Sequence, residues 1–133
     1  MRKASWRPAP GAEDRLSTPG AAVRLRLRAD RTALPADGTQ VLQLEAELLD
    51  ERGRPAEDEA VFCQVLGNLT LLGLENGQPD DLTPYSESFR MTREGTLTAY
   101  FRAGSVPGSA SVHLRTAQSV LTAVQRIRLS EIP

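Results

Sequence analysis

Cysteine, histidine and aromatic residues are scarce in this 133-residue chain, and each shortage argues against a class of site. Cys63 is the only cysteine, so the chain cannot form an internal disulfide. His113 is the only histidine, which argues against a zinc site or a Ser-His-Asp triad. Aromatic residues make up 5%, which is few for a carbohydrate-binding module that displays a row of exposed rings.

Long apolar runs and an excess of one charge are also missing. No run approaches the ~20 apolar residues that a membrane-spanning helix needs, so we expect no membrane insertion. The chain has 16 Lys and Arg residues against 17 Asp and Glu, a balance that gives no general attraction to nucleic acid. The sequence contains no glycine-rich phosphate loop and no calcium-binding loop spacing, and therefore predicts no cofactor and no metal.

Residues 1–20 differ in composition from the rest of the chain. Three prolines and two glycines stand among polar residues there, and no pattern would bury one face. This composition predicts an extended linker at 1–20, followed by a single domain at 21–133. The start of the chain also lacks the continuous apolar core of a signal peptide, and we interpret the chain as a segment of a longer protein.

The first strand is predicted directly after the linker, where apolar and basic residues alternate with a period of two. Val23, Leu25 and Leu27 share one face, and Arg24, Arg26 and Arg28 share the other. Three arginines on one face can indicate a polyanion site. Glu45 and Glu47 recur at the same spacing in the next run, so we favour ion pairs across neighbouring strands.

Six further runs predict strands, at residues 40–50, 60–67, 69–74, 95–103, 109–117 and 119–132. Two of them, 40–50 and 119–132, also fit a helix, but alternation and flanking turns favour strands. The nearly continuous apolar run at 60–67 predicts a central strand buried on both faces, with Phe62 in the core and Cys63 as a buried structural thiol. Phe101 is likewise predicted to be a core residue.

About seven short strands, joined by turns rich in Pro, Gly, Asn and Asp, predict an all-β fold, an immunoglobulin-like antiparallel β-sandwich. One joint is especially distinctive. Asn76-Gly77 predicts a turn with positive φ, after which the chain crosses a polar loop containing Pro79 and Pro84.

Two segments carry a resemblance to a known family. Residues 23–66, VRLRLRADRTALPADGTQVLQLEAELLDERGRPAEDEAVFCQVL, resemble a bacterial immunoglobulin-like domain, and residues 73–104, GLENGQPDDLTPYSESFRMTREGTLTAYFRAG, contain the more specific Asn-Gly-x-Pro loop. Together they are similar to the invasin-like domain in the C-terminal region of glycoside hydrolase family 2 enzymes of β-galactosidase type. The loop departs from that family at Glu75, where Gly or Ser is frequent, and near Gln78.

The resemblance implies a non-catalytic accessory domain that packs against other domains of a parent glycosidase, in the bacterial cytoplasm or secreted with that enzyme. The family's catalytic glutamates lie on a barrel domain upstream, so the loop carboxylates Glu75, Asp80, Asp81 and Glu87 are interpreted as solvated turn residues. Contacts with a neighbouring domain or a sugar are predicted at Tyr85, Arg90, Tyr100, Glu75 and Asn76. Two alternatives stay open: an adhesin-type surface stalk, and a weak carbohydrate-binding module that uses Tyr85 and Tyr100.

Overall fold

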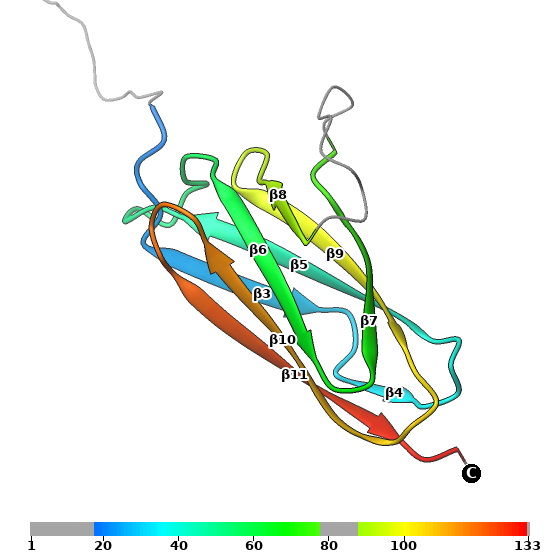
Figure 1. Ribbon diagram of the computed structural model, residues 1–133. Coiled ribbons are helices and arrows are strands. Elements are labelled where there is room, and N and C mark those ends of the chain that lie inside the picture. Colours follow the sequence, from blue (N-terminus) through cyan, green and yellow to red (C-terminus); the bar gives the residue numbers. More distant parts are fainter. Residues whose placement is uncertain (1–17, 78–87, 133) are drawn as a thin grey trace, which may run out of the picture.

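The computed structural model describes residues 18–77 and 88–132, and these form two β-sheets that face one another (Figure 1). The five-stranded sheet has the order β4 (Ala33–Pro35), β11 (Thr122–Ser130), β10 (Gly108–Thr116), β6 (Ala60–Leu66) and β8 (Phe89–Met91). The four-stranded sheet has the order β3 (Arg24–Ala29), β5 (Val41–Leu49), β9 (Thr96–Ala103) and β7 (Leu69–Glu75). The predicted all-β, immunoglobulin-like sandwich is confirmed.

The alternating patterns of β3 and β5 set the register of the four-stranded sheet. Arg26 pairs with Glu47 and Arg28 with Glu45 in the antiparallel ladder. Their side chains form ion pairs of 2.7 Å and 2.6 Å on the outer surface. The predicted pairing of these arginines with glutamates is therefore confirmed. Because exposed pairs add little stability, their main effect is to neutralise these two arginines.

The core lies between the sheets and is almost entirely aliphatic. β5 contributes its even-numbered residues and β9 its odd-numbered ones, as the period of two requires. Phe101 on β9 is fully buried, opposite Leu42 on β5 and Leu71 on β7. Cys63 is also buried, as predicted, and burial raises the pKa of its thiol to about 12, so the thiolate does not form at neutral pH.

The five-stranded sheet corrects two predictions: that the strand at 60–67 is buried on both faces, and that Phe62 is a core residue. β6 is buried on one face only, because Val61 and Cys63 point inward while Gln64 and Leu66 are exposed. Phe62 therefore lies on the outer face, half-buried, and is not a core residue. The sheet also contains β4 and β8, three residues each, which extend its two edges. The ambiguous runs at 40–50 and 119–132 form strands β5 and β11, as predicted.

The turn after β4 gives a test by pH. Asp37 accepts hydrogen bonds from the Thr39 backbone N–H (2.9 Å), from Gln40 Nε2 (3.0 Å) and from Thr39 Oγ1 (2.8 Å), and these lower its pKa from 3.8 to about 2. The folded state then binds this proton at lower pH than the unfolded state does. The stability that Asp37 contributes is complete above its unfolded pKa and is lost as the pH falls towards 2.

We expect the urea midpoint of the unmodified chain to fall more steeply between pH 5 and pH 2 than that of Asp37→Asn, which lacks this ionisation. Glu51→Gln removes an exposed carboxylate from another loop and is expected to keep the steep dependence. Equal slopes for Asp37→Asn and the unmodified chain would show that the turn does not contribute in this way.

Among the described residues, no helix is long and apolar enough to cross a membrane. The predicted boundary between linker and domain falls near the first described residues, Thr18 to Gly20, whereas residues 1–17 lie outside the described part. The 1–20 linker stays a prediction.

Candidate interdomain surface at the N-terminal pole

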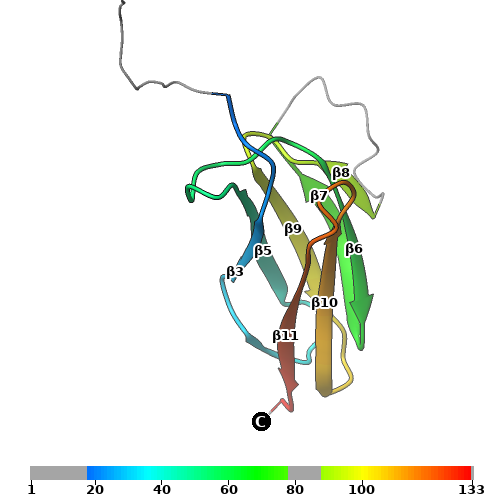
Figure 2. The ribbon, with the colours of Figure 1, turned by 90° about the vertical axis from the view of Figure 1, so that its left-hand side faces the viewer.

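The end of the sandwich where residues 18–23 arrive is called here the N-terminal pole (Figures 1 and 2). It is built from five segments that hydrogen bonds join: 18–23, 50–59, 75–77, 91–95 and 117–121. The backbone N–H of Glu57 donates to the Gly20 carbonyl at 2.9 Å, and that of Thr92 donates to the Glu59 carbonyl at 3.1 Å. Asn76 Nδ2 donates to the Met91 carbonyl at 2.9 Å.

Glu59, directly before β6, holds the β10–β11 turn in place. Its side chain is 4% exposed. One carboxylate oxygen accepts the backbone N–H groups of Gln118 (2.6 Å) and Ser119 (3.0 Å), and the other accepts Ser119 Oγ at 2.7 Å. Charge-assisted bonds of this kind are about twice as strong as neutral ones, so a buried carboxylate fixes the shape of this turn.

Val120, the next residue, is held in an unfavourable conformation. Its φ is 54°, in the left-handed region, where a β-branched residue is a genuine outlier. Its side chain is nevertheless 68% exposed, so burial in this domain does not offset the strain. The turn is instead fixed by Glu59 and by Thr116, whose Oγ1 accepts the Leu121 N–H at 2.8 Å. Strain maintained in this way is typical of sites where shape matters for function.

The neighbouring carboxylate, Asp58, holds a second strained turn. Its oxygens accept Thr92 Oγ1 (2.8 Å), the Gly95 N–H (2.8 Å) and the Glu94 N–H (3.3 Å). Glu94 has a φ of 51° and Gly95 a φ of 78°, so this β8–β9 turn also needs left-handed conformations. Asp58 and Glu59 thus fix two turns of the pole from one segment.

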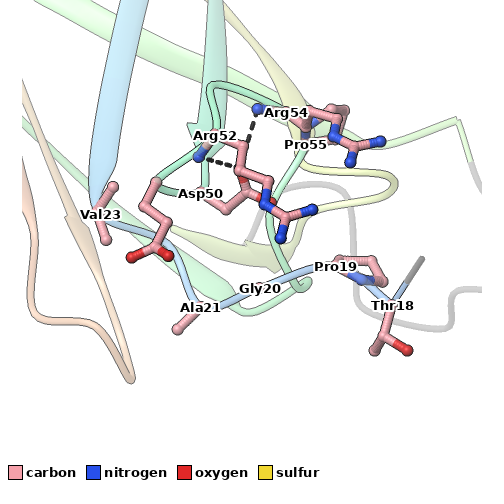
Figure 3. A pocket seen from close by; sticks show the side chains of 10 residues that line it. Thr18, Pro19, Gly20, Ala21, Val23, Asp50, Arg52, Arg54 and Pro55 are labelled. Atoms are coloured by element: carbon pink, nitrogen blue, oxygen red, sulfur yellow. Dashed lines mark hydrogen bonds between the residues drawn. The ribbon is translucent and has the colours of Figure 1, made fainter. Parts of the chain in front are cut away.

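The β5–β6 turn adds a groove of about 740 Å³ between residues 50–55 and the incoming segment 18–23 (Figure 3). Asp50 Oδ1 accepts the backbone N–H groups of Arg52 (2.9 Å) and Arg54 (3.0 Å). The N–H of Arg54 above all, together with those of Arg52 and Gly20, lowers the pKa of Asp50. Exposed side chains of Glu51, Arg52 and Arg54 line the groove, so its margin carries both acidic and basic groups.

These carboxylates are arranged for structure and not for glycoside hydrolysis. A retaining glycosidase needs two carboxylates about 5 Å apart facing a sugar, one of them protonated. Asp50 and Glu59 instead direct their oxygens at backbone N–H groups of their own domain. Among the described residues, no cluster of three or more His, Cys, Asp or Glu side chains could hold a metal ion.

The residues predicted as contacts are divided among three locations. Glu75 and Asn76 lie at the pole, where Glu75 Oε2 accepts the Gly77 N–H at 2.7 Å and Gly77 has the predicted positive φ, 76°. Tyr100 is half-buried on the outer face of the four-stranded sheet, opposite Gly73. Tyr85 lies outside the described residues.

Arg90 was predicted to contact a neighbouring domain, but its side chain is buried inside the sandwich. It pairs with Val61, which is fully buried, so both side chains point inward, and only 5% of Arg90 is exposed. In this conformation it has almost no surface to present to a neighbour. The loop carboxylates Asp80, Asp81 and Glu87 lie outside the described residues, so their interpretation as solvated turn residues stays a prediction.

Sequence reasoning missed the most constrained part of the pole. Glu59 and Ser119 are 60 residues apart, and an acidic residue before a strand is an ordinary turn feature. Val120 carried no signal of its own either, because valine in that run simply favours a strand. The turn that contains Val120 is bonded to Glu59, which lies far away in the sequence, through Gln118 and Ser119, so no local pattern encodes its shape.

Comparisons with known proteins agree with the fold. Residues 25–124 match the family described as glycoside hydrolase family 2 C-terminal domain 5. The chain is 30% identical to the beta-galactosidase BoGH2A of Bacteroides ovatus over 123 residues, which is 91% of this chain and 14% of that protein. A solved glycosyl hydrolase family 2 member from Bacteroides cellulosilyticus is 26% identical, with a TM-score of 0.79 over 86% of this chain and 15% of its own.

A weaker likeness extends to adhesins. The adhesin InvE of Yersinia pseudotuberculosis is 21% identical, with a TM-score of 0.56 over 82% of this chain and 27% of its own. This likeness shows a common fold only. The chain matches one small C-terminal part of these glycosidases and is an accessory, non-catalytic immunoglobulin-like domain. It spans about one seventh of the length of the glycosidases that it matches.

The chain belongs to the glycoside hydrolase family 2 C-terminal domain 5 family. The resemblance expected from residues 23–66 and 73–104 is therefore confirmed.

Proposed function

We propose that this domain stabilises a β-galactosidase-like glycoside hydrolase by packing its N-terminal pole against the domain that precedes it. Three features support this role. The chain matches one small C-terminal part of such enzymes. Residues 18–23 arrive at this end of the sandwich, so a preceding domain would lie closest to the pole (Figure 2). The pole also displays Val23 and Val120, which are 53% and 68% exposed.

The observation that carries the proposal is the strained and exposed Val120. An exposed valine at positive φ destabilises an isolated domain, and a glycine or asparagine would be the usual residue there. Buried Glu59 nevertheless holds the two residues before Val120, Gln118 and Ser119, in this turn. A rigid apolar side chain that projects from the pole suits insertion into a pocket on a neighbour, because the entropy cost of ordering it is already met.

Val120→Gly should therefore affect stability and docking in opposite directions. In the isolated chain, relief of left-handed strain outweighs the added flexibility of the unfolded state, and we expect a gain of about 0.5–1 kcal/mol in the free energy of unfolding. In the full-length enzyme the same substitution removes the inserted side chain, and we expect the domain to become more susceptible to limited proteolysis at residues 117–121. Urea titration and timed digestion measure the two effects.

Val41 provides the control, because it is another exposed valine but lies on the outer face of the four-stranded sheet. Val41→Thr is expected to change neither the proteolysis of the full-length enzyme nor the stability of the chain by more than about 0.5 kcal/mol. If Val120→Gly protects the domain equally in the isolated chain and in the full-length enzyme, the pole does not pack against a neighbour.

The remaining predicted contacts belong to the same proposal. Glu75 and Asn76 lie at the pole, and we propose that they border the interface, with Tyr85 as a further candidate from the segment outside the described residues. We propose residues 1–20 as the linker to the preceding domain. Tyr100 is the only aromatic residue among the described residues on its sheet face, so the sugar platform predicted from Tyr85 and Tyr100 has gained no further support.

A further inference from the structure

The outer face of the five-stranded sheet differs in charge pattern from the outer face of the four-stranded sheet. Its members, read from the strand registers, are Ala33 and Pro35; Ala60, Phe62, Gln64 and Leu66; Phe89 and Met91; Ser109, Ser111, His113 and Arg115; and Thr122, Val124, Arg126, Arg128 and Ser130. None of these residues is acidic, whereas three are arginines. The opposite sheet face instead pairs Arg26 and Arg28 with glutamates.

The same face also exposes a group of large apolar side chains. Leu66 and Val124 are 52% and 51% exposed, and Phe89 and Met91 at the edge strand are 37% and 44% exposed. Phe62 packs against Phe89 with ring centroids 5.6 Å apart. Between β6, β10 and β11 lies a hollow of about 320 Å³ whose lining includes Phe62, Gln64, His113, Arg115 and Val124. Apolar side chains gathered with arginine, without acidic residues, are typical of protein interfaces.

We infer that this face binds an acidic surface on another domain of the parent enzyme, a contact distinct from the one at the N-terminal pole. The inference rests on the proposed function in that both require a multidomain enzyme. The partner surface must offer carboxylates opposite Arg115, Arg126 and Arg128 and apolar groups opposite the hollow. The exposed arginines provide complementarity and register, and the apolar side chains provide most of the affinity.

A protein surface fits this face better than an acidic polysaccharide does. Sugars stack on the open face of an aromatic ring, but the Arg115 guanidinium lies 4.8 Å from the centroid of Phe62 and covers that ring. Phe89, the other ring on this face, packs against Phe62 and is only 37% exposed, and Leu66, Met91 and Val124 offer no flat surface. A second copy of this chain fits less well too, because the sheet glutamates Glu45 and Glu47 are already ion-paired.

Hydroxyl-radical footprinting with mass spectrometry tests the two contacts separately. It compares the full-length enzyme with the isolated chain, residue by residue. If the sheet face is covered, Leu66, Phe89, Met91 and Val124 react more slowly in the full-length enzyme, by on the order of tenfold, because water is excluded from an interface core. Val120 reports independently on the pole.

A charge-reversed variant gives the decisive comparison. Arg126→Glu/Arg128→Glu is expected to restore the reactivity of Leu66 and Val124 in the full-length enzyme at low salt, because it replaces two attractions with repulsions. Arg24→Glu/Arg102→Glu makes the same charge change on the opposite sheet and is expected to leave the protection intact. Isolated chains of both variants should unfold at the same urea concentration, since all four arginines are exposed.

Each outcome separates the two proposals. Protection of Val120 without protection of Leu66 and Val124 overturns the sheet-face inference and leaves the proposed function standing. Equal reactivity at both places in the two samples overturns both. Protection that depends on the concentration of the isolated chain indicates a second copy, and protection that appears only on addition of polygalacturonate indicates a polysaccharide. Either of these results also overturns the inference.

Discussion

Replacing Phe101 by alanine is expected to lower the free energy of unfolding of the isolated chain by about 3–5 kcal/mol. Phe101 is fully buried at the centre of the four-stranded sheet, where it lies opposite Leu42 and Leu71 on the neighbouring strands. The truncation removes the transfer free energy of a phenyl ring and leaves a cavity that strands on both sides cannot close. Because domains of this size are stable by only about 5–15 kcal/mol, this single change removes a large part of the total.

Urea titration followed by far-ultraviolet circular dichroism measures the effect, and Phe89→Ala is the matched control. Phe89 is also a phenylalanine on a strand, but it is 37% exposed on the outer face of the other sheet. Losing its packing against Phe62 should cost less than about 1 kcal/mol. Similar losses for the two variants would contradict the assignment of Phe101 to the core and Phe89 to the surface.

Local patterns in the sequence were sufficient to predict most of the fold. The alternation in residues 23–28 and 42–48 specifies which faces are apolar. The spacing of Arg24, Arg26 and Arg28 also predicts pairing with Glu45 and Glu47, but it fits more than one register. Asn76-Gly77 identifies its own turn, because asparagine and glycine tolerate positive φ. The family resemblance rested on the same features, since turns and alternation are what sandwiches of this kind share.

The same patterns failed where both faces of a strand look alike or where contacts are distant. In β6, Val61 and Cys63 alternate with Phe62 and Gln64, so hydrophobicity alone did not reveal which face is inside. β4 and β8 have three residues each, too few to show a period. Arg90 is buried because β8 pairs with β6 in a register that places it opposite the inward-facing Val61. Its charge alone would predict an exposed side chain.

Glu59→Ala is expected to lower the free energy of unfolding by about 3 kcal/mol, because it removes a buried carboxylate that accepts three hydrogen bonds from the β10–β11 turn. Glu59→Gln keeps the shape of the side chain but loses the charge and one acceptor, so we expect about half that loss. Glu57→Ala removes an exposed carboxylate from the same segment and is the control. Urea titration of the three variants gives the order directly.

A double-mutant cycle with Val120→Gly shows whether Glu59 is what maintains the strain. With Glu59 present, glycine at position 120 is expected to add about 0.5–1 kcal/mol, because left-handed strain is relieved. Without Glu59 the turn is free to relax out of the left-handed region, so Val120→Gly should then add nothing, and the two changes couple by roughly that amount. Strictly additive effects would mean that Val120 keeps its conformation without Glu59. In that case the buried carboxylate stabilises the turn but does not hold Val120 in position for a neighbouring domain.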